Sequence, residues 1–340
     1  LSALFAYLAV KDIRWGDFFA TLQQDKEWWY LLPAVLLFMG SFGFRAIRWH
    51  YLLQPVRSIR LHPLFSAIMI GYMGNNVLPV RLGEILRAYA LNRETGISKS
   101  AGLASIVVER LVDTLGLLSF IVIAIASAAL PERYHSGMII LAGVALGILA
   151  FLIAITFFEE QAAGILEKLY GLLPEVIGTK LSDITRSFLQ GLTGLRATHN
   201  YGRILLYTGL IWGLFAGSTY FMLRAFNFDA AYGMHFWAGI VIFLIGTMGV
   251  MVPSSPGYVG TFHYAIIQGL ALYSVPREAA LGFAIVIHLM NYIPVTGLGL
   301  IYFIREGLRF KEVSSVSGED LEKESREVLR EEYTPEDRET

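Results

Sequence analysis

Two long apolar stretches of this chain are each interrupted by proline and glycine, and these interruptions constrain the fold more than any other feature. The first reads GYMGNNVLPVRLGEILR from Gly71 to Arg87, and the second reads GTMGVMVPSSPGYVGTF from Gly246 to Phe262. In a bilayer every backbone N–H and C=O group needs an internal partner, so a broken helix is tolerated only where protein or a hydrated cavity surrounds it. We therefore expect both interruptions to border a polar cavity within a membrane protein.

The composition agrees with a membrane location. Hydrophobic residues make up 55% of the 340 residues and charged residues 16%, which is too apolar for a soluble domain. About 20 apolar residues cross a bilayer, and the predicted spans are Trp28 to Leu53, Leu103 to Leu130, Ser136 to Phe158, Ile204 to Leu223 and Ala279 to Ile304. The predicted fold class is therefore all-α, a polytopic transmembrane helix bundle. Leu1 to Val10 is half a span, and we interpret it as the end of a further helix.

The distribution of Lys and Arg predicts the orientation, because basic loops face the cytoplasm. One set of loops is rich in basic residues, including Arg57, Arg60, Arg93, Lys99, Lys168, Lys180, Arg203, Arg305 and Arg309. On this assignment the elements Leu61 to Leu91 and Phe236 to Tyr273 enter from opposite faces. We expect two re-entrant or broken helical hairpins, related as an inverted repeat. The alternative is two ordinary tilted spans that are kinked by proline.

The chain divides into a membrane domain, residues 1–305, and an acidic cytoplasmic tail, residues 306–340. Within the membrane domain, Leu181, Ile184 and Phe188 recur at helical spacing, which predicts a cytoplasmic amphipathic segment over residues 159–200. The tail carries 12 acidic and 6 basic residues, whereas the preceding part carries 16 acidic and 21 basic residues. We expect the tail to be a solvated helix or disordered.

The densest polar cluster surrounds the first interruption and consists of Asn75, Asn76, Arg81, Glu84 and Arg87. The helix breaks are expected at Pro79 and Gly83, where a new helix exposes unpaired N–H groups that favour an anion. Guanidinium groups match the geometry of a phosphate, and Glu84 lies three residues from each arginine and can hold both in place. The alternative is a juxtamembrane patch of salt bridges.

A second cluster, Glu109, Arg110 and Asp113, lies near the start of the next predicted span. Glu109 and Asp113 share one helix face, which is repulsive unless a cation or a proton lies between them. Arg81 and Arg87 are the expected partners. This cluster either locks two helices together or handles substrate or protons directly.

Arg45 and Arg48 lie at the inner end of the Trp28 to Leu53 span, where we expect their side chains to snorkel toward lipid phosphates. The alternative for this pair is an entrance for a lipid headgroup.

The third cluster follows the second interruption and offers hydroxyl and backbone donors without an arginine. Its predicted helix breaks are Pro253 and Pro256, and its candidate binding residues are Ser254, Ser255, Gly257, Gly260, Thr261 and His263. A lone histidine on an apolar helix is more often a hydrogen-bonded packing residue than a functional one, and His288 and Asn291 are of the same kind.

The sequence also lacks several motifs that are typical of catalytic, metal-binding and nucleotide-binding sites. It has no cysteine, no phosphate-binding loop of the G-x-x-x-x-G-K type, no H-E-x-x-H and no G-x-S-x-G. We therefore expect no cofactor, no metal, no catalytic residue and no nucleic-acid partner.

Three segments together, NNVLPVRLGEILRAYAL, VVERLVDTLGLL and PSSPGYVGTF, are similar to the lysylphosphatidylglycerol synthase transmembrane-region family. The resemblance covers roughly residues 29–304. It implies a polytopic inner-membrane protein that moves lipids between leaflets, with aminoacylated phosphatidylglycerol as the best-known cargo. Many relatives carry an acidic residue directly after the second Gly-x-Gly turn, where this chain has Thr261, Phe262 and His263. This departure puts the cargo in question.

The leading hypothesis is accordingly a lipid flippase that moves an anionic or aminoacylated phospholipid, or a related lipid-linked headgroup, across the inner membrane, with a cytoplasmic C-terminus. One alternative is a membrane-embedded enzyme that modifies a phospholipid or a polyprenyl phosphate, with Glu109 and Asp113 holding a metal. Another is a non-catalytic protein that binds a synthase or a glycosyltransferase.

Overall fold

The elements of this computed structural model are all helices wherever the chain is described, namely at residues 2–23, 26–78, 82–127, 200–252 and 254–308 and at a few isolated positions between 136 and 150. They are α1 (Ser2–Val10), α2 (Trp15–Gln23), η1 (Trp28–Tyr30), α3 (Leu31–Leu53), α4 (Leu61–Val77), α5 (Gly83–Thr95), α6 (Lys99–Ala126), α10 (Tyr201–Ala225), α11 (Phe228–Tyr232), α12 (Phe236–Met251), η4 (Pro256–Tyr258), α13 (Thr261–Ala271) and α14 (Arg277–Arg305). The predicted all-helical fold class is confirmed over this part of the chain.

Three of the helical segments are long and apolar enough to cross a membrane: Trp28–Leu53, Tyr201–Ala225 and Arg277–Arg305. They match three of the predicted spans. Helix α6 covers most of a fourth, but it carries Glu109, Arg110 and Asp113 in its first half. The predicted span Ser136 to Phe158 lies largely outside the described residues, and the amphipathic segment 159–200 lies outside them except for Asn200. Nearly all of the tail lies outside them as well.

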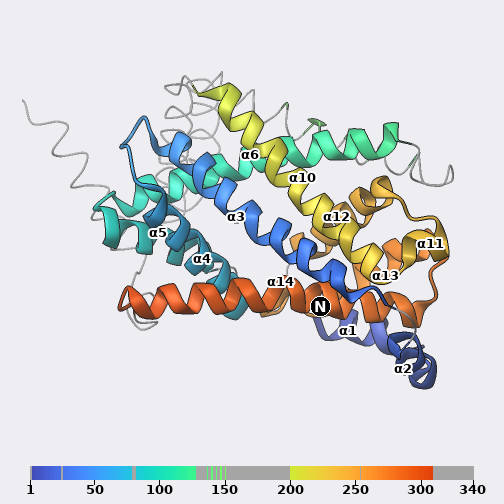
Figure 1. Ribbon diagram of the computed structural model, residues 1–340. Coiled ribbons are helices and arrows are strands. Elements are labelled where there is room, and N and C mark those ends of the chain that lie inside the picture. Colours follow the sequence, from blue (N-terminus) through green and yellow to red (C-terminus); the bar gives the residue numbers. More distant parts are fainter. Residues whose placement is uncertain are drawn as a thin grey trace, which may run out of the picture.

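The bundle has two ends that can be defined from contacts. At the first, which we call the basic end, Gln54 after α3 accepts a hydrogen bond from Asn200 before α10, and Arg57 donates to the Thr95 carbonyl at the end of α5. At the far end, Glu27 N donates to the Ala225 carbonyl, so that α3 begins where α10 ends. Helices α3 and α10 therefore run antiparallel and side by side, as Figure 1 shows at the centre of the molecule.

Helices α4 and α5 form an antiparallel hairpin whose two outer ends lie at the basic end. The contact between them is close because glycines face each other: a Cβ atom at Gly74 would lie 2.8 Å from the Gly83 Cα, and one at Gly71 would lie 2.7 Å from the Arg87 Cβ. Helix α4 ends at Val77 and α5 begins at Gly83, so the helical structure is interrupted where the sequence predicted it. Pro79 itself lies outside the described residues.

Helices α12 and α13 form a second antiparallel hairpin, whose outer ends lie at the far end. A Cβ atom at Gly249 would lie 2.6 Å from the Ala265 Cβ, so glycine again permits a close crossing. The break between Met251 and Thr261 contains the short helix η4, which begins at Pro256, and it matches the second predicted interruption. Pro253 lies outside the described residues.

The two hairpins meet at their tips. A Cβ atom at Gly257 would lie 3.5 Å from the Asn76 carbonyl oxygen and 2.9 Å from the Tyr292 ring, so η4 packs against the end of α4 and against α14. The hairpins thus extend toward each other from opposite ends of the bundle. Their passage through a membrane and their relation as an inverted repeat stay predictions.

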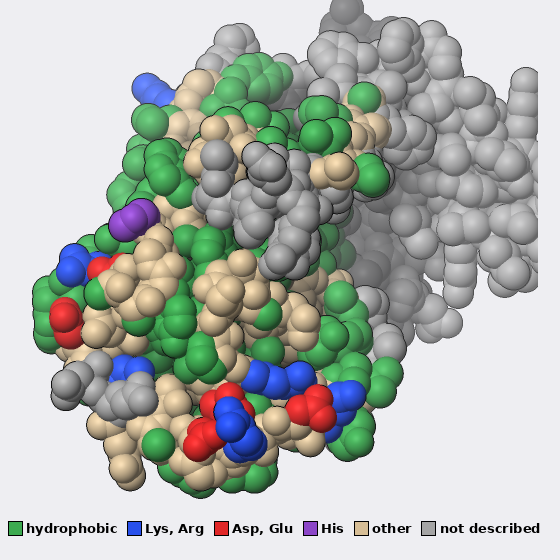
Figure 2. All heavy atoms as spheres, turned by 90° about the vertical axis from the view of Figure 1, so that its right-hand side faces the viewer, with side chains coloured by type: hydrophobic (Ala, Val, Ile, Leu, Met, Phe, Trp, Pro, Cys, Tyr) green, Lys and Arg blue, Asp and Glu red, His purple; other side chains and the backbone are tan. Residues whose placement is uncertain are grey.

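The surface of the described part is strongly apolar. Large hydrophobic side chains are exposed along several helices, including Leu32, Leu36, Leu206, Ile293 and Ile304. Figure 2 shows one face on which hydrophobic side chains predominate and acidic and basic side chains lie beside each other in small groups. Such a surface is typical of a protein that faces lipid.

Candidate functional site

A cavity of about 430 Å³ opens between the two hairpins and the long helices. Its charged lining consists of Arg45 from α3, Glu84 from α5, and Arg110 and Asp113 from α6. The rest of the lining is largely aromatic or neutral, with Tyr72, Trp212, Phe215, Phe243, Tyr258 and Phe262 among the rings. A cavity with charged, neutral polar and aromatic groups suits an amphipathic ligand.

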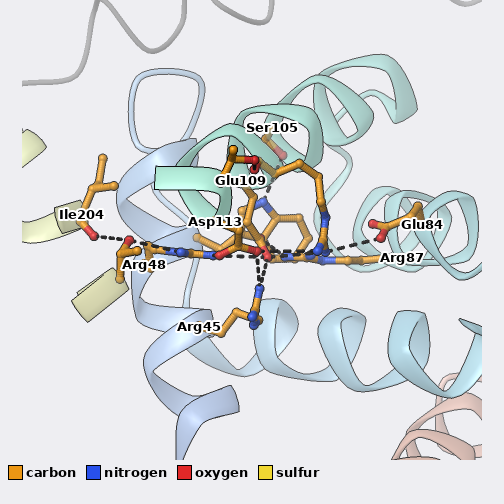
Figure 3. Close-up of polar contacts among 12 residues, drawn as sticks. Arg45, Arg48, Glu84, Arg87, Ser105, Glu109, Asp113 and Ile204 are labelled. Carbon is orange, nitrogen blue, oxygen red and sulfur yellow. Dashed lines mark hydrogen bonds and ion pairs between the residues drawn. The ribbon is translucent and has the colours of Figure 1, made fainter. Parts of the chain in front are cut away.

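The charged part of the lining belongs to a larger charge cluster, which we define as Arg45, Arg48, Glu84, Arg87, Glu109, Arg110 and Asp113. Figure 3 labels its members other than Arg110. Arg45 Nη1 lies 2.8 Å from Glu109 Oε1 and 2.9 Å from Asp113 Oδ2. A cation therefore separates the two carboxylates, as their spacing on one helix face requires. Arg48 and Arg110 also contact both carboxylates, but Arg45 has the shortest pair of contacts, and the sequence analysis did not name it as a partner.

Arg87 is the partner that the sequence did predict. Its Nη2 atom lies 2.6 Å from Glu109 Oε2, and its guanidinium stacks on Trp49 at 3.7 Å from the ring centroid. Trp49 in turn donates to Ser105 on α6 at 3.0 Å. Arg87 is 1% exposed and Glu109 is 0% exposed, so this pair is fully removed from solvent.

Arg45 and Arg48 do not lie where the sequence analysis placed them by default. They are 5% and 0% exposed, so neither side chain snorkels toward lipid phosphates. Arg48 Nη2 lies 2.7 Å from Asp113 Oδ1, and Arg48 Nη1 donates to Thr208 on α10. The prediction was wrong because the paired carboxylates lie on α6, more than 60 residues away, and draw both arginines inward. The alternative role at a headgroup entrance stays a prediction, and Arg45 does line the cavity.

Arg110 is the accessible member of the charge cluster. Its side chain is 44% exposed, and it lies 3.3 Å from Glu84 and 3.5 Å from Asp113. The charge cluster contains four guanidinium groups and three carboxylates, so it carries a net charge of +1. The excess positive charge borders the cavity and favours an anion there.

The remaining residues of the first predicted cluster surround the hairpin tip. Asn75 lines the cavity, and its Oδ1 atom accepts a hydrogen bond from Gly83 N, so it caps the start of α5. Asn76 donates to Thr296 on α14 at 2.8 Å. Arg81 lies outside the described residues. The structure thus brings Asn75, Glu84, Arg87, Glu109, Arg110 and Asp113 together around one region.

The residues of the third predicted cluster lie in several different environments. Ser255 N donates to Ser2 on α1, and Gly260 also packs against α1. Thr261 is buried and bonds to the Tyr258 carbonyl, and Gly257 lies at the meeting point of the hairpins. The buried Oγ atom of Ser254 has no partner among the described residues. The His263 ring lies 4.7 Å from that of His288 and beside Phe262, which lines the cavity.

Sequence reasoning missed the aromatic part of the lining. Trp212 and Phe215 on α10 and Phe243 on α12 are ordinary apolar residues in their own helices. Only the packing of α10 against α6 and α12 brings them to the cavity. The hydrogen bond between Arg48 and Thr208 joins residues 160 positions apart, and no local sequence pattern predicts it.

The fold and the site together define a helical membrane protein with a charged cavity between two broken hairpins. The chain belongs to the lysylphosphatidylglycerol synthase transmembrane-region family, whose model matches residues 1–299. No solved structure matches it.

Curated relatives are archaeal. The chain is 25% identical to a UPF0104 membrane protein of Methanothermobacter thermautotrophicus, over 81% of this chain and 83% of that protein. It is 26% identical to a UPF0104 membrane protein of Methanocaldococcus jannaschii, over 67% of this chain and 92% of that protein. It is 25% identical to glycosyltransferase AglD of Haloferax volcanii, over 78% of this chain but 47% of AglD.

Proposed function

We propose that this protein is a lipid flippase whose cavity binds the phosphate-containing headgroup of an anionic lipid. The observation that carries the proposal is the cavity of about 430 Å³, with the charge cluster on one side and aromatic rings on the other. A lipid needs both environments, because its phosphate interacts favourably with cations and its hydrocarbon chains interact favourably with apolar surface.

Arg110 is the first contact for the phosphate in this proposal. It combines accessibility with a position in the cavity lining. Two of its three carboxylate partners, Glu109 and Asp113, also contact other arginines, and the third, Glu84, is partly exposed. When a phosphate binds Arg110, Glu109 and Asp113 keep Arg45, Arg48 and Arg87 as partners. The charge cluster can therefore exchange one ion pair without leaving a buried carboxylate uncompensated.

Transport requires two alternating states of the cavity, and the hairpins provide the elements that can differ between them. Their tips meet at Asn76 and Gly257, between the two ends of the bundle. In the proposal each hairpin is re-entrant, the basic end faces the cytoplasm of the inner membrane, and separation of the tips opens a path for the headgroup. Helix α14 ends at the basic end, where Gly307 lies beside Arg93 of α5, so in this proposal the tail that follows is cytoplasmic.

The test is lipid transport by the purified protein in vesicles. Fluorescent phosphatidylglycerol is placed in one leaflet, and its movement is followed by chemical quenching. The parent is expected to move it faster than empty vesicles, and Arg110→Gln to reduce the protein-dependent rate about tenfold, which corresponds to ~1.4 kcal/mol. Arg60→Gln, at an exposed arginine of the basic end, is the matched control and is expected to keep the parent rate. Equal rates for Arg110→Gln and the parent would contradict the role of Arg110.

A second candidate function follows from the relative AglD, which is named a glycosyltransferase. In this alternative the chain modifies a lipid-linked headgroup or supports a protein that does so. An enzyme that holds a metal ion with Glu109 and Asp113 is disfavoured, because the Arg45 guanidinium lies between these two carboxylates. Mass spectrometry of lipids incubated with the purified protein and sugar donors tests it, and a modified lipid would favour the enzyme over the flippase.

A further inference from the structure

We infer that the cavity selects lipids whose phosphate carries a neutral, hydroxyl-rich group such as a sugar, over lipids whose headgroup carries an amine. The inference rests on the proposed function and names the class of its cargo. It comes from the side chains that line the cavity and from the partners that they already have.

An amine would need a carboxylate, and the carboxylates of the charge cluster are occupied. Glu84 lies 3.3 Å from Arg110, Glu109 lies 2.6 Å from Arg87, and Asp113 lies 2.7 Å from Arg48. Among the described residues, Glu84 and Asp113 are the acidic residues of the cavity lining. An ammonium group at Glu109 or Asp113 would have to displace a guanidinium. One at Glu84 would have to compete with Arg110, and in either place the net charge of the cluster is already positive.

Aromatic rings are the other common site for an ammonium group. Two rings of the lining already face a cation, because the Arg45 guanidinium lies 5.6 Å from the Tyr72 ring centroid and 6.0 Å from that of Phe215. The rings nearest to the charge cluster therefore carry a positive charge of the protein itself, which disfavours a second one beside it.

Neutral polar groups, in contrast, enter the cavity from several helices. They are Asn75 from α4, Thr114 from α6, Ser218 and Thr219 from α10, Thr247 from α12 and Asn291 from α14. The buried Oδ1 atom of Asn291 has no partner among the described residues, so it is an acceptor in need of a donor. Thr247 donates to the Phe243 carbonyl, which leaves its oxygen lone pairs to accept from a hydroxyl group.

The remaining rings suit the other surface of a sugar. Trp212, Phe243 and Tyr258 line the cavity together with these amide and hydroxyl groups. The face of an aromatic ring is electron-rich and attracts weakly positive C–H groups, such as those on one side of a sugar ring. A sugar is apolar on the faces of its ring and carries hydroxyl groups at its edge. The aromatic rings of the cavity match its faces, and the amide and hydroxyl side chains between them match its edge.

The experiment compares headgroups on the same acyl chains in vesicles. Fluorescent phosphatidylinositol, phosphatidic acid and lysyl-phosphatidylglycerol share these chains, and a glycosyl-phosphoryl polyprenol, which has an isoprenoid chain instead, is tested beside them. We expect the hydroxyl-rich phospholipid or the glycosyl polyprenol to move about tenfold faster than the lysyl lipid. Whichever of the two moves faster identifies the lipid source. Equal or faster movement of the lysyl lipid overturns the inference and leaves the flippase proposal standing, whereas no movement of any lipid overturns both.

Conservative variants locate the selectivity. Thr247→Val and Asn291→Leu are expected to slow phosphatidylinositol about fivefold, the effect of one neutral hydrogen bond, and to leave phosphatidic acid unchanged. Thr21→Val is the matched control, because Thr21 also bonds to the carbonyl four residues before it but lies on α2, outside the cavity lining. Unchanged transport of phosphatidylinositol, or an equal loss for both lipids, overturns the assignment of these groups.

Discussion

At the scale of single residues, the charge cluster explains how ionised groups persist inside an apolar bundle. Removing a charge from water costs several kcal/mol unless a partner and hydrogen bonds replace the water. Glu109 has guanidinium contacts on both of its oxygens, from Arg45 on α3 and Arg87 on α5. The charge cluster therefore joins α3, α5 and α6, and loss of one member removes an ion pair from at least one other.

The first prediction concerns Arg45, the cation between Glu109 and Asp113. Arg45→Met is expected to lower the free energy of unfolding by about 1–3 kcal/mol, because Glu109 and Asp113 each lose one buried hydrogen bond while their other guanidinium partners remain. Thermal unfolding in detergent measures the effect. Arg60→Met, at an exposed position, is expected to change stability by less than about 0.5 kcal/mol.

A second variant distinguishes charge from packing at the same place. Adding Asp113→Asn to Arg45→Met completes a double-mutant cycle for this ion pair of 2.9 Å, so the double variant is expected to lose less stability than the two single variants lose in sum. If the two losses simply add, the loss at Arg45 comes from the packing of the arginine stem and the electrostatic account is wrong.

At the scale of elements, the hairpins depend on glycine at the crossing of their helices. Gly71, Gly74 and Gly83 bring α4 and α5 so close that any side chain would collide with the facing backbone. This arrangement fixes Arg87 one turn into α5, where it reaches Glu109 on α6. The glycines of the GYMG pattern and Gly83 thus allow the close packing of α4 and α5 that positions the charge cluster.

The third prediction follows from this packing. Gly83→Ala is expected to destabilise the protein by about 1–3 kcal/mol, since its Cβ atom would lie 2.5 Å from Asn75 N and 2.6 Å from Asn75 Oδ1. Gly209→Ala in α10 has open space around it and is expected to be neutral or stabilising, because alanine favours a helix. Thermal unfolding of both variants checks the opposite signs, and an equal loss for both would contradict the close crossing.

The elements could largely be predicted from the sequence, and their partners could not. Long apolar runs and Pro/Gly breaks are local signals, so the spans that contain Trp28–Leu53, Tyr201–Ala225 and Arg277–Arg305 and both hairpin breaks were predictable. The pairing of Arg87 with Glu109 followed from charge on neighbouring elements. The burial of Arg45 and Arg48 did not, because snorkelling at a helix end gives the same local pattern.

At the scale of the whole molecule, the two hairpins extend from opposite ends of the bundle and meet beside the cavity. Asn76 at the tip of the first hairpin is hydrogen-bonded to Thr296 on α14 at 2.8 Å. In the proposed mechanism this contact belongs to one of two states, so transport requires it to open. The chain contains no cysteine, which makes a cysteine cross-link free of background.

The fourth prediction uses that contact. The variant Asn76→Cys with Thr296→Cys is expected to lose lipid transport when it is oxidised and to regain it when it is reduced. Each single cysteine variant serves as the control and is expected to be insensitive to oxidation. Full transport by the oxidised double variant, with the cross-link verified by mass spectrometry, would show that the first hairpin does not move relative to α14.

The most direct test asks where a lipid headgroup resides. Phosphatidylglycerol with a photoreactive group on its headgroup is added to the reconstituted protein, activated by light and located by peptide mass spectrometry. The account predicts labels on the cavity lining, at Glu84, Asp113 and the neighbouring rings, and their loss in the presence of excess unlabelled lipid. Labels confined to exposed apolar positions such as Leu36, Leu206 and Ile293 would contradict it.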